Sequence, residues 1–148
     1  MGCLGAKAYD PSTAVTKATS ALLAMTAIDT TNLRITFTPP ASGRVLVRLQ
    51  GCVHGATTFP TILLGVLEGA TVIMRVSPIG GLKTTAVATA MVTQEASFVI
   101  EGLSGPKTWD AAYGVETIVA GTGIKYGGPN NATANNAFGA FVFEIWEA

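Results

Sequence analysis

Apolar and polar residues alternate along several short stretches of the chain, with the period of two that is typical of half-buried β-strands. The clearest case is residues 33–38, where every second residue is Leu, Ile or Phe and the others are Arg or Thr. After a turn rich in Pro, Ser and Gly at residues 39–43, the same alternation returns over residues 45–53. The pattern predicts two strands that each bury one face against a core.

Further strands are predicted where apolar and β-branched runs are bounded by turn residues. These runs are residues 21–28, 61–68, 71–76, 86–93, 97–101, 108–118 and 137–146. Gly69 and Ala70 separate two of the runs and predict a tight hairpin. Many short strands with Gly and Pro turns are typical of sandwiches and jelly rolls. We therefore predict an all-β jelly-roll or β-sandwich fold of about nine strands, without a helix.

The first 20 residues lack this periodicity. Asp10 and Pro11 form a turn, and the neighbouring side chains are small or polar. We expect an extended N-terminal arm at residues 1–20, followed by one jelly-roll domain at residues 21–148. The apolar residues that the arm would bury against a partner are Leu4, Tyr9 and Val15.

The last predicted strand is largely apolar on both faces. One face carries Phe138, Ala140, Val142, Glu144 and Trp146, and the other carries Gly139, Phe141, Phe143, Ile145 and Glu147. An antiparallel strand of a solvated sandwich is polar on one face. Two apolar faces therefore indicate a core on one side and another subunit on the other, or a loop of the same chain on the other. The candidate core and interface residues are Phe138, Phe141, Val142, Phe143, Ile145 and Trp146, together with Trp109 and Tyr113.

The charge content supports association. Charged residues make up 12% of the 148 residues and the formal net charge is zero, whereas ordinary domains have about 25% charged residues. A net charge near zero promotes association. The chain has no basic run, so it has no basis for binding nucleic acid through phosphates. No apolar stretch reaches the length of about 18 residues that would predict a membrane-spanning helix.

No group of residues predicts catalysis or cofactor binding. His54 is the only histidine and no nucleophile-elbow motif is present, so we expect no enzyme. Cys3 and Cys52 are too few for a zinc site or a disulfide framework, and the acidic residues are scattered, so no metal or cofactor is expected. One alternative is a sugar-binding platform made by aromatic residues and an Asn-rich loop. Its residues would be Trp109, Tyr126, Asn130, Asn131, Asn135 and Asn136.

Several segments together resemble a known group of proteins. They are IDTTNLRITFTPPASG at residues 28–43, WDAAYGVE at residues 109–116, YGGPNNAT at residues 126–133 and AFGAFVFEIW at residues 137–146. These segments resemble small virion proteins of tailed bacteriophages, whose jelly roll is similar to that of tumour-necrosis-factor-like trimers. Within that group the chain most resembles head decoration proteins.

The resemblance implies a function and partners. It implies a homotrimer that is made in the host cytoplasm and binds the outer surface of the virion head. There it would stabilise the capsid by contacting the major capsid protein, with the arm residues Leu4, Tyr9 and Val15 among the contacts. The alternatives are a receptor- or glycan-binding module of a phage tail and a cytokine-like trimeric ligand.

Overall fold

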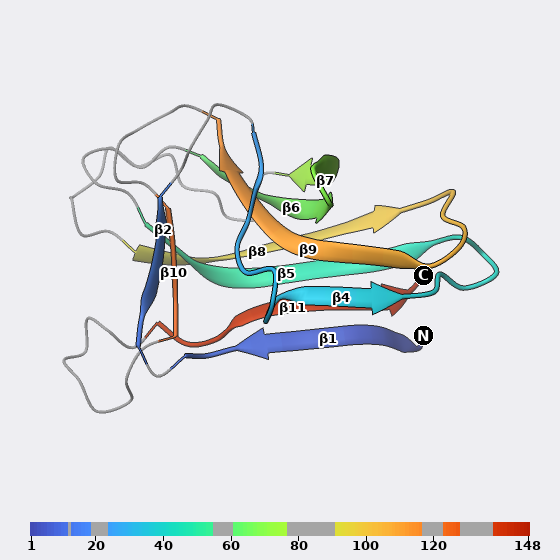
Figure 1. Ribbon diagram of the computed structural model, residues 1–148, viewed down its shortest axis with the longest axis horizontal. Coiled ribbons are helices and arrows are strands. Elements are labelled where there is room, and N and C mark those ends of the chain that lie inside the picture. Colours follow the sequence, from blue (N-terminus) through green and yellow to red (C-terminus); the bar gives the residue numbers. More distant parts are fainter. Residues whose placement is uncertain (12, 19–23, 55–60, 77–90, 117–122, 128–137) are drawn as a thin grey trace.

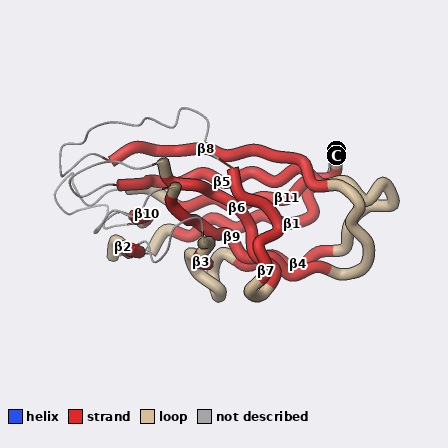
Figure 2. The backbone as a smooth tube through the Cα atoms, turned by 90° about the horizontal axis from the view of Figure 1, so that it is seen from above, coloured by secondary structure: helices blue, strands red, loops and turns tan. Residues whose placement is uncertain are grey.

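A computed structural model describes the chain from residue 1 to 148 except residues 12, 19–23, 55–60, 77–90, 117–122 and 128–137 (Figure 1). The described residues form strands in two sheets and include no helix (Figure 2). The predicted all-β sandwich is confirmed. Among these residues no helix could span a membrane.

The first sheet is built around a long central strand, β5 (Val45–His54). One edge of β5 pairs with β11 (Phe141–Glu147) and, further along, with β10 (Gly123–Tyr126). Outside these lie β1 (Cys3–Tyr9), which pairs with β11, and β2 (Val15–Ala18), which pairs with β10. The other edge of β5 pairs along its whole length with β8 (Met91–Ile100). The sheet is therefore four strand positions wide, because β1 with β2 and β11 with β10 each occupy one position.

The second sheet is arranged in the same way around β9 (Lys107–Val115). On one edge β9 pairs with β4 (Arg34–Phe37) and with the short β3 (Thr26–Ala27). On the other edge it pairs with β6 (Ile62–Glu68), which in turn pairs with β7 (Thr71–Val76). The predicted hairpin at Gly69 joins β6 to β7, and Gly69 has a φ of 60°, which favours glycine.

Apart from the pairings of β5 with β10 and β11 and of β6 with β9, these pairings are nested along the chain. The innermost pair is β6 with β7, followed outwards by β5 with β8, β3 and β4 with β9, and β1 and β2 with β11 and β10. The chain is thus one long antiparallel hairpin that is rolled into two facing sheets, which is the arrangement of a jelly roll.

Three of the strand positions are interrupted, between β1 and β2, β3 and β4, and β10 and β11. The described residues form eleven strands instead of the expected nine, because β1, β2 and β10 were not predicted and residues 91–93 and 97–101, predicted in two strands, both belong to β8. Between β3 and β4, Asp29 accepts hydrogen bonds from the backbone amides of Thr31 and Asn32, both at 2.8 Å, and so stabilises a turn. The interruption still pairs with β9, since Ile28 donates to the carbonyl of Ala111 at 2.9 Å. Parts of the predicted strands at residues 21–28 and 86–93 lie outside the described residues.

The core fills the space between the two sheets. Trp109 is fully buried and packs edge-on against Phe37, with ring centroids 4.8 Å apart. From the first sheet, Phe141 and Phe143 are also fully buried. The ring of Phe141 lies directly over Gly51, where any side chain would overlap it, so the central strand needs glycine at this point.

The N-terminal segment differs from the expected arm, because it belongs to the first sheet. In β1, Tyr9 lies opposite Phe141 and Cys3 lies opposite Trp146. Leu4, Tyr9 and Val15 are partly buried and pack against the core of their own chain. The described residues of the segment therefore form edge strands rather than a free extension. The domain boundary at residue 20 stays a prediction.

Candidate interaction surface

The outer face of the first sheet carries the apolar side chains that the core does not use. Along β11, Phe141, Phe143 and Ile145 point into the core and are fully buried. Val142 and Trp146 alternate with them on the outer face and are half-buried. Both faces of the strand are therefore apolar, and only the inner face is covered by the core of the sandwich.

Strand register arranges the outer side chains in rows that cross the sheet. One row joins β1, β11, β5 and β8 and consists of Cys3, Trp146, Leu46 and Val99. We call these four residues the apolar rung. Val99 is 42% exposed, which makes it one of the few large apolar side chains with high exposure among the described residues. With neighbouring strands about 4.8 Å apart, the rung crosses roughly 14 Å of the face.

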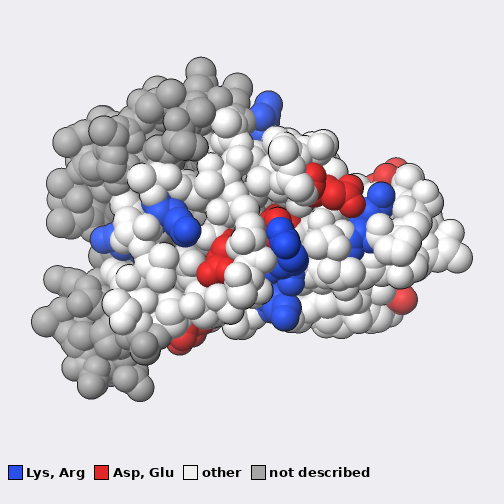
Figure 3. All heavy atoms as spheres, viewed as in Figure 1, with Lys and Arg blue, Asp and Glu red and all other residues white. Residues whose placement is uncertain are grey.

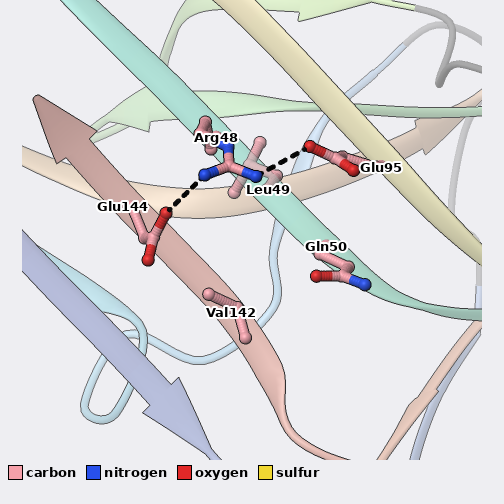
Figure 4. Close-up of a pocket in the computed structure, with 6 residues that line it drawn as sticks. All are labelled: Arg48, Leu49, Gln50, Glu95, Val142 and Glu144. Carbon is pink, nitrogen blue, oxygen red and sulfur yellow. Dashed lines mark hydrogen bonds and ion pairs between the residues drawn. The ribbon is translucent and has the colours of Figure 1, made fainter.

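Ion pairs lie on both sides of the apolar rung. On one side Arg44 pairs with Glu101 at 2.9 Å. On the other side Arg48 lies between Glu95 at 3.2 Å and Glu144 at 3.5 Å, in a small hollow of the surface (Figure 4). Exposed pairs of this kind stabilise a fold by about 0–1 kcal/mol each. Their larger effect is that each of these three carboxylates contacts an arginine, with Arg48 shared by two of them, which lowers the charge repulsion that a partner would meet.

A hydrogen bond connects the apolar rung to the charged residues beside it. The Trp146 indole donates Nε1–H to Oε2 of Glu144 at 3.3 Å. This bond holds the ring beside the row of ion pairs and leaves its apolar body on the outer face. On the face shown in Figure 3, the charged side chains of the described residues form small clusters separated by uncharged areas.

The ion pair of Arg34 and Asp110 has a structural role in the second sheet. Arg34 on β4 donates two hydrogen bonds to Asp110 on β9, at 2.7 and 2.8 Å, and Asp110 is only 2% exposed. Hydrogen bonds to this carboxylate raise the pKa of Arg34 above its usual value. Because the two residues are also paired in register, the bidentate contact fastens β4 to β9.

Two side chains with reactive groups lie close together in the first sheet. Cys52 and His54 are buried near the end of β5. Burial raises the pKa of the Cys52 thiol, whereas a nucleophilic cysteine needs a lowered pKa. Burial, and then the charge of Lys125, lower the pKa of His54. In the part of the chain that the structure describes, no group of three or more His, Cys, Asp or Glu residues is placed to hold a metal ion.

The predicted sugar-binding platform is wrong for its two aromatic members. Trp109 is fully buried and Tyr126 is 1% exposed, so neither ring is on the surface. Strand register determines on which side of the sheet each ring lies, and the residues of the nearby loop do not reveal that register. The asparagines of the proposed platform, Asn130, Asn131, Asn135 and Asn136, lie outside the described residues.

Tyr113 belongs to the core as well. It is fully buried, and its hydroxyl donates to the backbone carbonyl of Ala18. Burial raises the pKa of Tyr113 to about 12, and that of Tyr126 also to about 12. Phe138, by contrast, is half-buried, with the Lys125 ammonium 5.4 Å from the centre of its ring.

The structure therefore divides the predicted interface residues. Those in the core are Trp109, Tyr113, Phe141, Phe143 and Ile145, and those that remain half-exposed are Phe138, Val142 and Trp146. The sequence interpretation missed Leu46 and Val99. The signal for Leu46 was present, because it stands at an outward position between Arg44 and Arg48 where the alternation calls for a polar residue.

Comparison with known proteins does not place the chain in a family: no family model matches it, and no curated protein matches it. The class that the fold defines is an all-β jelly roll.

Proposed function

We propose that this protein is a virion structural protein without enzymatic activity, which binds the outer surface of a tailed-phage head as a homotrimer and stabilises the capsid. The observation that carries the proposal is the apolar rung, formed by Cys3, Trp146, Leu46 and Val99 on a sheet face that no strand of the described residues covers. In the assembled head, the partners of this face and of the strands beside it are further copies of the chain and the major capsid protein.

The physical argument begins with the low charge of the chain. Nine basic and nine acidic residues among 148 leave most of the surface uncharged, and a surface without net charge has little repulsion to overcome on association. Burying apolar area contributes about 25 cal/mol per Å², from which the costs of association are subtracted. A stable interface covers about 800 Å² on each partner, so the rung would be its apolar centre and the flanking ion pairs its rim.

Attachment to a capsid adds a second argument, which concerns the number of contacts. A trimer presents three copies of every surface, so individually weak contacts act together once the first has formed. The edge strand β1 contributes the exposed Cys3 to the apolar rung. We propose that β1 and β2, with Leu4, Tyr9 and Val15, form the part of each subunit that contacts the capsid. The protein would be made in the host cytoplasm and reside on the head.

The variant Leu46→Glu tests this proposal. Leu46 is in the middle of the apolar rung, and a carboxylate there would have to be desolvated at the interface. We expect binding to heads, assembled from the capsid protein of the same phage without this chain, to weaken at least about tenfold, which corresponds to 1.4 kcal/mol. Binding is measured by co-sedimentation, and circular dichroism verifies the fold.

Thr36→Glu is the matched control. Thr36 is exposed on the outer face of the second sheet, so it receives the same charge on a surface that the proposal does not use. It should bind like the natural chain. Equal binding of Leu46→Glu and Thr36→Glu, or no binding of the natural chain to such heads, would contradict the proposal.

A further inference from the structure

The sheet edges of this molecule differ in how they are protected. An unpaired edge strand can accept another strand, and proteins prevent this with short strands, irregular register and inward-pointing charges. β1 has a register shift between Cys3 and Gly5, and its exposed Lys7 lies opposite the core residue Phe143. β2, β3 and β4 have four residues or fewer. β7 pairs with β6 through a register shift.

Strand β8 has none of these protections. It is ten residues long, and it pairs with β5 at all ten positions without a shift. Its sequence, MVTQEASFVI, contains no Lys, Arg or Pro. Among the described residues no strand pairs with its other edge, and β8 runs along the border of the molecule (Figure 2).

Two hydrogen bonds at the end of the sheet show which backbone groups of β8 are free. Ala148 donates to the carbonyl of Arg44 at 3.3 Å, and Glu147 donates to that of Gly2 at 2.8 Å. Backbone groups alternate between the two neighbours of a strand, so Arg44 and every second residue after it face β11, and the residues between them face β8. Carried across the register to residues 92–100 of β8, the alternation leaves four residues with their N–H and C=O groups toward the free edge. They are Thr93, Glu95, Ser97 and Val99.

We propose that β8 pairs antiparallel with β8 of a second copy of this chain, about a two-fold axis at Ala96. The pairing sets Glu95 opposite Ser97 of the second copy and Thr93 opposite Val99 of the second copy. All four free residues on each chain then find partners, and the first sheets of the two copies become one continuous sheet.

The charge pattern of β8 favours a second copy as the occupant. Glu95 is the only charged residue of the strand, and in this register it faces a serine rather than its own counterpart. Arg48 of the same chain is 3.2 Å from Glu95 and compensates its charge. An axis at Glu95 would place two carboxylates directly opposite, which is destabilising. An axis at Ala96 also pairs every residue from 92 to 100, nearly the full length of the strand.

This contact goes beyond the proposed function and does not depend on it. A two-fold contact cannot close a trimer, so it adds to the three-fold contact by joining one trimer to another. Three-fold and two-fold contacts together would produce a hexamer or a net of trimers.

Replacing Ser97 with proline tests the contact. Proline removes one N–H that points to the free edge and leaves the hydrogen bonds between β8 and β5 in place, and edge strands tolerate proline at such positions. By symmetry two hydrogen bonds of the dimer are lost, so we expect β8 pairing to weaken by roughly 10- to 100-fold. Ser97→Ala keeps the N–H and is the control. Light scattering over a concentration series should show fewer chains per particle for Ser97→Pro than for Ser97→Ala and the natural chain, and half as many where the natural chain is a hexamer.

The number of chains separates this inference from the trimer. If the natural chain forms particles of six chains and Ser97→Pro forms particles of three, both contacts are supported. If the natural chain forms dimers and Ser97→Pro is a monomer, the β8 contact is supported and the trimer is contradicted. The same number of chains in all three proteins overturns the β8 contact. Hydrogen exchange of the natural chain gives a reading that needs no variant. Amides of Thr93, Glu95, Ser97 and Val99 should become protected as concentration rises, and fast exchange at every concentration overturns the inference.

Discussion

Replacing Phe143 with alanine is expected to lower the free energy of unfolding by about 3–5 kcal/mol. Phe143 is fully buried on the inner face of β11, in the same cluster of core residues as Phe141. Removing the ring leaves a cavity between two sheets that are held apart by their other side chains, so the site cannot collapse to fill it. Urea denaturation monitored by circular dichroism measures the change.

The neighbouring residue provides the control for this change. Val142 lies on the outer face of the same strand and is half-buried. Val142→Ala removes apolar atoms from the same strand without opening a core cavity, so its cost should be about 1 kcal/mol or less. Similar costs for Phe143→Ala and Val142→Ala would show that the assignment of the two faces of β11 is wrong.

Deleting residues 1–19 is expected to cost about 3 kcal/mol or more of stability. The deletion removes β1 and β2 and leaves β11 and β10 as unpaired edges. It also removes Leu4, Tyr9 and Val15, which pack against the core. The shift of the urea midpoint, compared with that of the full chain, measures the loss.

Replacing Leu4, Tyr9 and Val15 together with alanine separates the contribution of backbone pairing from that of side-chain packing. This variant keeps the backbone pairing of both strands and loses only the side-chain packing, so it should be less destabilised than the deletion. If the deleted chain unfolds at the same urea concentration as the full chain, the segment is a dispensable arm, and residue 20 is a true domain boundary.

The parts of the fold that the sequence predicted well are those set by local alternation. Leu33, Ile35 and Phe37 are all buried, with exposures of 5% or less, and the polar residues between them are exposed. The hairpin at Gly69 is local too, since two turn residues between two apolar runs specify it. The opposite faces of β11 follow from the same period of two.

The N-terminal strands could not be predicted from local pattern, because what makes them strands is their partner. β1 consists mostly of small or exposed residues, so alternation is weak, and it is extended because β11 offers it an edge. Gly5 illustrates the dependence on distant residues. A side chain there would overlap Ile35, which lies in the other sheet, and nothing near Gly5 in the sequence reveals that contact.

In the candidate surface, too, some residues could be predicted from the local sequence and others depend on distant segments. Trp146 and Val142 were recognised because they belong to one strand with two apolar faces. The apolar rung needs the register of four strands, which brings Leu46 beside Trp146 and Val99 beside Leu46 from positions far apart in the chain. Register across strands is a property of the folded sheet and is not encoded in any one segment.

The measurement that tests the central claim most directly is the mass of the purified full-length protein in solution. A chain of 15.2 kDa that assembles through the apolar rung should give three times that mass at micromolar concentration, or a multiple of the trimer where β8 edges also pair. Sedimentation equilibrium gives this mass without assumptions about shape. A mass of one chain, unchanged over the whole concentration range, would contradict the claim that the protein works by assembling with copies of itself.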